Sequence, residues 1–253
     1  MISYEDRDKL ETEKIPIGRK NYVGVEIEFI LNIDKMDKLE ELLIERNLQY
    51  NVDITDDGSI EPDDKDDIEE SIWGDKYFLD EEGIELRILA EESEVKLIVS
   101  QCLAIIRSVG GRVNNSCGLH VHIDLRSRDI KKVYNNFFMC QDLMFATQPK
   151  SRQNSDFCKK LSRLNSEGRS RYYAINKAAY EKHKTIEIRL HEATLTTKNV
   201  LRWIELLIYI ASIEKTLTKK ITLPSQLAIS NSLKGHLNDR IEKYSNESNS
   251  KGA

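Results

Sequence analysis

Residues 24–29 read GVEIEF, and from Val25 onward they alternate between apolar and acidic side chains. In a β-strand, the side chains at positions i and i+2 point to the same face of the sheet. The apolar residues therefore share one face, whereas Glu26 and Glu28 project together from the opposite face, about 7 Å apart. The stretch predicts a strand that is buried on one side and carries two carboxylates on the other.

Three further stretches repeat this alternation and predict three more strands of the same kind. Their polar faces carry Glu85 and Arg87 in residues 83–88 (GIELRI), His120, His122 and Asp124 in residues 117–124 (CGLHVHID), and Glu187, Arg189 and His191 in residues 185–191 (TIEIRLH). The solvated face of an antiparallel sheet is normally rich in Thr, Ser, Lys and Gln. These four faces carry little besides Glu, His and Arg, which favours a functional site.

Four glutamates converge if the four strands pair in one sheet, namely Glu26, Glu28, Glu85 and Glu187. Unpaired carboxylates that lie so close repel one another and raise one another's pKa, and a divalent cation removes this conflict. Oxygen-rich ligands together with an imidazole suit Mg²⁺ or Mn²⁺. Arginines such as Arg87 and Arg189 suit phosphate oxygens. The polar face therefore predicts a site for a divalent metal and a nucleotide.

Segments with helical periodicity follow the strands and cover residues 35–47, 93–109, 129–147 and 197–216. Residues 48–54 predict one further strand. Because no linker separates these units, we expect one domain over residues 1–245, followed by a disordered tail over residues 246–253. The predicted fold class is α+β, with an antiparallel sheet curved into a trough, a polar, metal-binding face, and helices packed on the apolar face.

Two strongly charged stretches interrupt this pattern. Residues 53–70 are acidic and predict a solvated loop. Residues 149–171 are basic, and we expect a mobile segment there. This segment could close over phosphates through Arg163, Arg169 and Arg171.

Composition excludes several classes of protein. The chain has 253 residues, 38 basic and 43 acidic side chains, and a formal net charge of −5, so it has no overall cationic field for nucleic acid or an anionic membrane. The charged N-terminus lacks the apolar region of a signal peptide, and the most apolar run, residues 204–213, is shorter than the roughly 18–20 residues that span a bilayer. We expect a cytoplasmic protein with reduced cysteines that uses neither membrane nor nucleic acid as a partner.

The stretches GVEIEF, GIELRI, CGLHVHID and TIEIRLHEATL, in this order, resemble the amidoligase family, whose members share the fold class of glutamine synthetase and γ-glutamylcysteine synthetase. The resemblance runs from about residue 22 to residue 210. It implies a domain similar to the glutamine synthetase catalytic domain. It also implies an ATP-dependent ligase that joins a carboxylate to an amine through an acyl phosphate. The two substrates could belong to small molecules, peptides or proteins.

The resemblance also implies roles for individual residues. Metal ions would be held by Glu26, Glu28, Glu85, His120 and Glu187. The nucleotide would be bound by His120, Arg189 and the turn that begins at Asn114, to which we add His122, Arg163 and Arg171. Asp57 and Ser59 are similar to a substrate-side D-x-S motif, and with Arg87 and Arg189 they complete the candidate catalytic set.

Two other functions remain open from the residues. A zinc hydrolase could bind its metal through His120, His122 and either Asp124 or His191. A zinc hydrolase would give no role to three glutamates and two arginines on the same face of the sheet. A nucleic-acid-binding protein could use the basic segment with Tyr172 and Tyr173 as stacking residues, but the net charge argues against it.

Overall fold

A computed structural model describes residues 20–62, 81–164 and 170–250, with side chains described to residue 246. Three of our expectations therefore fall partly outside the described residues. They concern the acidic stretch from residue 63 to 70, the part of the basic segment that contains Arg169, and the tail from residue 251 to 253.

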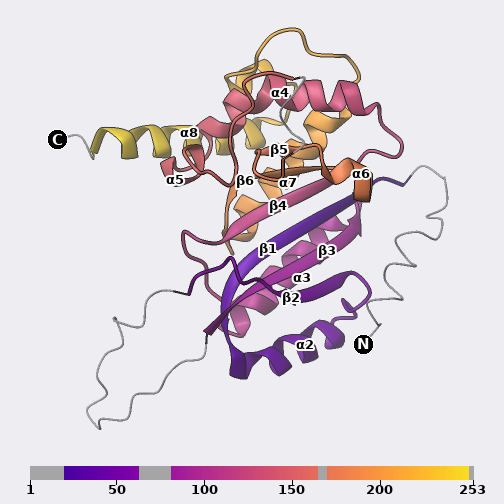
Figure 1. The fold of residues 1–253 in the computed structure, drawn as a ribbon, viewed down its shortest axis with the longest axis vertical. Helices are drawn as coiled ribbons and strands as arrows, with labels where there is room; N and C mark the ends of the chain where they lie inside the picture. Colours follow the sequence, from indigo (N-terminus) through magenta and orange to yellow (C-terminus); the bar gives the residue numbers. More distant parts are fainter. Residues whose placement is uncertain (1–19, 63–80, 165–169, 251–253) are drawn as a thin grey trace.

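Within the described residues, six strands form one antiparallel sheet in the order β2-β3-β1-β4-β6-β5 (Figure 1). The strands are β1 (Tyr22–Asn32), β2 (Val52–Asp56), β3 (Glu81–Glu91), β4 (Gly118–Asp124), β5 (Ile175–Asn176) and β6 (Thr185–Glu192). The predicted antiparallel sheet is thus confirmed. β1 lies inside the sheet, between β3 and β4, so residues 24–29 have a paired strand on at least one side and mostly on both.

The alternation of β1 determines which face is buried. Val25, Ile27 and Phe29 are fully buried, and their side chains belong to one continuous core. On the other face, Glu26 pairs with Arg87 of β3 and with His120 of β4. Directly paired residues of antiparallel strands share a face, so the polar side chains of neighbouring strands meet.

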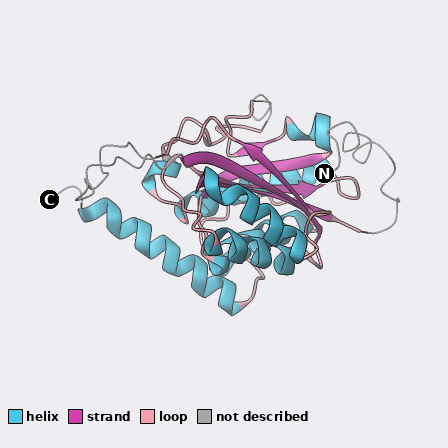
Figure 2. Cartoon of the chain, turned by 90° about the horizontal axis from the view of Figure 1, so that it is seen from below, coloured by secondary structure: helices cyan, strands magenta, loops and turns pink. Residues whose placement is uncertain are grey.

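The sheet is a twisted layer that is not strongly curled, which corrects the predicted trough (Figure 2). Strong curvature requires bulges or glycine kinks at several places. The pairings of β1 with β3 and β4, and of β2 with β3, keep a continuous register. A register shift occurs between β4 and β6, near Leu119 and Val121.

The predicted helices are present as α2 (Met36–Glu45), α3 (Val95–Ser108), α4 (Ile130–Ala146) and α7 (Thr197–Ser212). Their buried side chains join the apolar face of the sheet in the same core. Local chemistry sets their ends. Asp129 accepts hydrogen bonds from the backbone of Lys131 and Lys132 at the start of α4, and Gly110, with φ of 86°, follows the end of α3.

The structure also contains elements that we did not predict. They are the short strand β5 and η1 (Ile33–Lys35), α5 (Lys150–Gln153), α6 (Ala179–His183), η3 (Pro224–Gln226) and α8 (Asn231–Ser250). α8 is anchored by the buried Leu233, Leu237 and Tyr244. Because a helix anchored in this way can continue beyond its last buried side chain, residues 246–250 are helical where we expected disorder.

The described part of the basic segment differs from the mobile segment that we expected. Arg152, Cys158 and Leu161 are buried, and the side-chain amide of Gln141 bonds both the N–H and the carbonyl of Leu161. This stretch therefore packs against α4. None of the described helices combines the length and the apolar composition needed to cross a membrane.

Candidate metal centre

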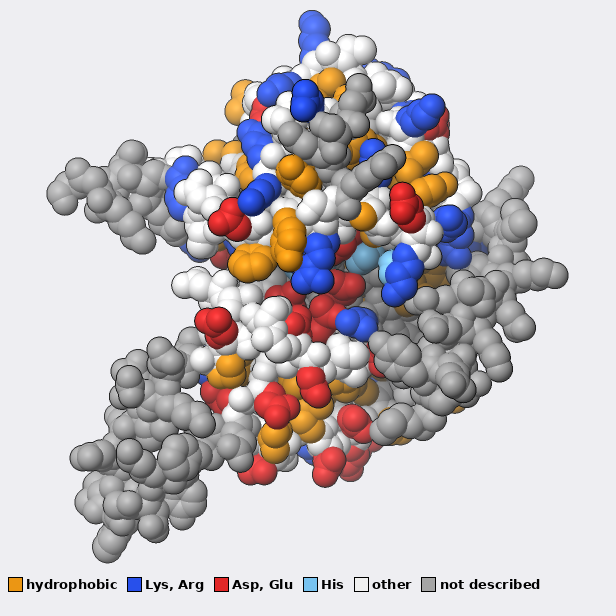
Figure 3. Space-filling model, in the orientation of Figure 1, with side chains coloured by type: hydrophobic (Ala, Val, Ile, Leu, Met, Phe, Trp, Pro, Cys, Tyr) orange, Lys and Arg blue, Asp and Glu red, His pale blue; other side chains and the backbone are white. Residues whose placement is uncertain are grey.

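A cleft of about 580 Å³ lies over the polar face of the sheet. Its lining includes most of the predicted site residues: Glu26, Glu28, Asp57, Ser59, Glu85, Arg87, His120, His122, Arg171, Glu187 and Arg189. Figure 3 shows acidic side chains gathered in this hollow, with lysines and arginines above them. The structure thus brings together residues that lie up to about 160 positions apart in the chain.

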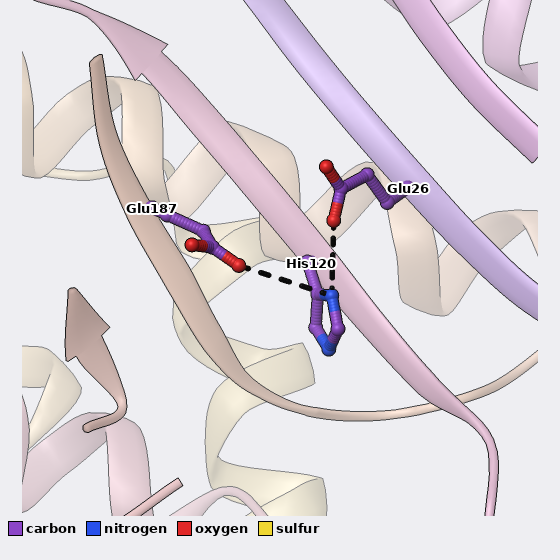
Figure 4. A group of neighbouring side chains, drawn as sticks. All are labelled: Glu26, His120 and Glu187. Atoms are coloured by element: carbon purple, nitrogen blue, oxygen red, sulfur yellow. Dashed lines mark hydrogen bonds and ion pairs between the residues drawn. The ribbon is translucent and has the colours of Figure 1, made fainter. Parts of the chain in front are cut away.

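His120 lies at the centre of the acidic cluster (Figure 4). Its Nδ1 lies 3.1 Å from Glu26 Oε2 and 3.9 Å from Glu187 Oε1. Its Nε2, on the other side of the ring, lies 3.4 Å from Glu28 Oε1. The imidazole therefore touches carboxylates through both of its nitrogens.

Two groups of potential metal ligands share this imidazole. One consists of Glu26, His120 and Glu187, and the other consists of Glu28, Glu85 and His120. Within each group, the ligand atoms all lie within 4.8 Å of one another. Apart from the half-buried Glu26, all of these side chains are buried.

Two of the arginines that line the cleft each form an ion pair with the glutamate two positions earlier in the chain. Arg87 pairs with Glu85, and Arg189 pairs with Glu187. The second oxygen of Glu187 accepts a 2.6 Å hydrogen bond from Asn176 of β5, a site residue that sequence reasoning missed. Nε of Arg189 is buried and has no hydrogen-bond partner among the described residues. The Arg189 side chain as a whole lines the cleft and is 20% accessible.

The pKa values in the cluster follow from burial and from close charges. Burial opposes the ionisation of Glu26, but the close approach of His120 and His122 outweighs it and holds the pKa of Glu26 well below its usual value. Burial, followed by the charge of Glu26, raises the pKa of Glu85, although Arg87 opposes this shift. Burial alone would lower the pKa of His122, but Glu26 raises it. Among these groups, Glu85 is the carboxylate whose charge burial and the neighbouring Glu26 disfavour.

The donor set fits a divalent metal ion. The cleft is lined by six carboxylates, three arginines and one lysine, which leaves an excess of two negative charges when the histidines are neutral. Carboxylate oxygens with a single imidazole match the preferences of Mg²⁺ and Mn²⁺. Glu26, Glu28, Glu85, His120 and Glu187 are the residues that could hold such ions.

A bulge in β6 removes His191 from this face, which corrects our prediction. Val121 pairs with Ile188, but Leu119 pairs with His191, so β6 has one more residue than β4 at this point. His191 therefore lies on the apolar face, fully buried, with its ring 5.0 Å from that of Trp203. Strict alternation in the sequence cannot reveal such an insertion.

The zinc-hydrolase hypothesis required either His191 or Asp124 as a third ligand beside His120 and His122. The bulge removes His191 from the polar face. Asp124 is buried in a two-hydrogen-bond ion pair with Arg126 and does not line the cleft. Neither Asp124 nor His191 belongs to a potential metal-ligand group within the described residues.

Two predicted nucleotide-binding residues lie away from the cleft. Asn114 bonds the carbonyl of Glu61 and the N–H of Ser116, and it lines a separate cavity of about 180 Å³. Arg163 is exposed and does not line the cleft. In contrast, Asp57 and Ser59 lie in the cleft wall, where Asp57 Oδ1 accepts a 2.8 Å bond from the N–H of Ser59 and a 2.7 Å bond from its hydroxyl.

The cleft lining also includes Asn176, Lys182 and His183, which were not among the predicted site residues. They belong to β5 and α6, which connect the basic segment to β6. These elements are too short to produce a detectable periodicity, so the sequence carries no signal for them.

Residues 97–165 match the model of a family described as "Putative amidoligase enzyme". This match confirms the amidoligase resemblance for that stretch, which contains β4 with His120 and His122. The glutamates on β1, β3 and β6 lie outside it. A search of curated proteins found no match.

Proposed function

We propose that the chain is an ATP- and Mg²⁺-dependent ligase that joins a carboxylate to an amine through an acyl-phosphate intermediate. The observation that carries this proposal is the convergence of four glutamates around His120, with Arg87 and Arg189 beside them. The amidoligase match over residues 97–165 supports the reaction class. We extend the proposed likeness to a fold of the glutamine synthetase catalytic type, because the candidate ligands lie on the open face of an antiparallel sheet.

The chemistry requires a phosphate site beside the carboxylate substrate. Direct attack by an amine on a carboxylate would expel an oxide, which is a poor leaving group. In the proposed reaction, a carboxylate oxygen attacks the terminal phosphorus of ATP and releases ADP. The amine then attacks the acyl carbon, phosphate leaves, and the amine loses a proton. Bound divalent cations would neutralise the phosphate charge during this reaction.

The arginines would act on phosphate oxygens. Arg189 lines the cleft with 20% of its side chain accessible, so its guanidinium can donate to a ligand oxygen while the ion pair with Glu187 holds it in place. Arg87 is the more exposed of the two, with 44% of its side chain accessible. Planar guanidinium groups suit phosphate because they donate two parallel hydrogen bonds.

The two walls of the cleft suggest where the substrates bind. Arg171 and Lys182 supply cations on one wall, and we place the nucleotide phosphates towards them. Asp57 and Ser59 lie on the other wall, at the end of β2, and we place the carboxylate and amine substrates there. We propose small-molecule, peptide or protein substrates as the partners.

A substrate screen tests this function. Purified protein is incubated with ATP, Mg²⁺ and pools of amino acids or peptides, and both ADP release and new amide masses are measured. We expect ADP and an amide in equal amounts with at least one pool, and neither product from the Glu187→Gln variant at the same Mg²⁺ concentration. Amide-bond cleavage that needs no ATP but needs bound zinc would support a hydrolase instead.

A further inference from the structure

We infer that Gly118 is a positioning residue that holds Glu28 against His120 and so completes the Glu28–Glu85–His120 group. The inference rests on the proposed binding of divalent ions at this site. It concerns a residue that has no ligand atom of its own, because its side chain is a hydrogen atom.

Gly118 fixes one oxygen of Glu28 through its backbone. Its N–H donates a buried hydrogen bond of 2.5 Å to Glu28 Oε2. The other oxygen, Oε1, then lies 3.4 Å from His120 Nε2. One carboxylate oxygen is thus tied to the main chain of β4, which directs the other towards the imidazole.

The missing side chain at Gly118 provides the space in which these groups meet. A Cβ atom at this position would lie 2.9 Å from His120 Nε2 and 3.2 Å from Glu28 Oε2. Both distances are shorter than ordinary van der Waals contacts, so the neighbouring groups would have to move. The side chains of His120 and Glu28 are only 5% and 8% accessible, so neither can turn into solvent.

Backbone conformation does not explain this glycine. Among the described glycines, Gly110 is the one with a positive φ, and Gly118 lies in the extended strand β4. Any residue could adopt its conformation. The requirement for glycine at this position is therefore one of space.

The effect of an added methyl group should differ between the two ligand groups. Nε2 of His120 faces Glu28, whereas Nδ1 faces Glu26 and Glu187. Nδ1 is bonded to the ring carbon at which the imidazole pivots, and Nε2 lies at the far end of the ring. A push at Nε2 therefore displaces the contact with Glu28 more than the contacts with Glu26 and Glu187.

Titration with Mn²⁺, followed by electron paramagnetic resonance of the free ion, tests this selectivity without an activity assay. We expect wild type to bind two ions and Gly118→Ala to bind one with similar affinity and the other at least about tenfold more weakly, the scale for loss of a group that orients a ligand. Gly235→Ala is the matched control, because a Cβ at Gly235 in α8 meets nothing within 4 Å.

The outcomes separate this inference from the proposed function. Two Mn²⁺ ions bound to Gly118→Ala with wild-type affinities would overturn the role of Gly118 and leave metal binding intact. A wild-type protein that binds no Mn²⁺ would overturn the proposed metal dependence, and the role of Gly118 with it.

A double-mutant cycle without metal covers the case in which Gly118→Ala folds poorly. We expect Gly118→Ala to lower the urea midpoint in the wild-type background and to change it little in the His120→Ala background, where the ring that it would strike is gone. If Gly118→Ala alone does not fold, folding of the double variant Gly118→Ala/His120→Ala would also support the inference. The same loss in both backgrounds, or no loss in either, would overturn it.

Discussion

Arg152 donates a 2.6 Å hydrogen bond from Nη2 to the main-chain carbonyl oxygen of Arg189. Its Nε bonds the next carbonyl, that of Leu190, at 3.3 Å, and the whole residue is buried. These carbonyls lie in the β6 bulge, where the pairing with β4 is interrupted. The guanidinium of Arg152 therefore donates the hydrogen bonds that these two carbonyls do not receive from β4. In this way it stabilises the bulge, which directs Arg189 and His191 to opposite faces of the sheet.

Replacement of Arg152 by Gln should therefore loosen the bulge. We expect a loss of about 2 kcal/mol in the free energy of unfolding, the scale for buried hydrogen bonds from a charged donor. Urea denaturation measures it. The matched control is Lys150→Gln on the same short helix, whose side chain is exposed and which should change stability by less than about 0.5 kcal/mol. Equal effects of the two substitutions would contradict this role.

Arg189 and Glu187 should affect different steps of the proposed reaction. Arg189→Lys keeps the charge but loses the planar pair of donors, so we expect ATP binding to survive and turnover to fall roughly a hundredfold. Glu187→Gln removes a candidate metal ligand, so raised Mg²⁺ should recover part of its lost turnover but none of the loss in Arg189→Lys. Steady-state kinetics at several Mg²⁺ concentrations test both expectations. Full turnover by Arg189→Lys would reduce Arg189 to a structural partner of Glu187.

The C-terminal helix α8 should stabilise the end of β6. Arg240 is buried and bonds the carbonyl of Thr147 at 2.9 Å and Glu192 Oε1 at 2.9 Å. We expect Arg240→Ala to lower the free energy of unfolding by about 2 kcal/mol, because Glu192 and a buried carbonyl lose a charged donor. Asn238→Ala on the exposed side of α8 is the control. A melting temperature in Arg240→Ala equal to that of the control would show that the docking of α8 does not depend on this contact.

Stability should fall between neutral and mildly acidic pH because of two buried histidines near Arg240. Burial, followed by the charge of Arg240, lowers the pKa of His236 to about 4 and that of His191 well below its usual value. The unfolded chain binds protons on these residues near pH 6.5, before the folded chain does. The two histidines therefore make their full contribution to the free energy of unfolding above pH 6.5. This contribution is lost progressively as the pH falls towards 4.

The pH dependence of wild-type stability also contains a contribution from His122, whose raised pKa makes the folded state more stable as the pH falls. The His236→Gln variant isolates the contribution of His236, because it leaves His122 unchanged. Urea midpoints measured from pH 8 to pH 5 should decline less steeply in His236→Gln than in wild type. Parallel pH profiles would mean that His236 does not contribute to the decline.

The sequence predicted the parts of the site that depend on alternation. Val25, Ile27 and Phe29 are buried, and Glu26 and Glu28 share the open face, because a period of two is imposed by strand geometry itself. The pairing of Glu26 with His120 then followed from the assembly of these strands in one antiparallel sheet.

The parts that sequence reasoning missed depend on irregular structure. The β6 bulge moved His191, and no local pattern marks an extra residue whose partner strand lies more than 60 positions away. Asn176 reaches Glu187 from a strand of two residues. The apolar spacing of Leu233, Leu237 and Tyr244 is helical, and it could have revealed α8, but the many Ser and Asn residues between them obscured it.

We expect the Glu–His cluster, formed by Glu26, Glu28, Glu85, His120 and Glu187, to bind a divalent cation together with ATP. Crystals grown with Mn²⁺ and a non-hydrolysable ATP analogue would locate the ion through anomalous scattering from manganese. We predict an anomalous peak roughly 2.0–2.3 Å from His120 Nδ1 and from oxygens of Glu26 and Glu187, with phosphate density between the peak and Arg189. A cluster without any manganese peak, in crystals whose nucleotide is bound elsewhere, would overturn the proposed binding of metal and nucleotide at this site.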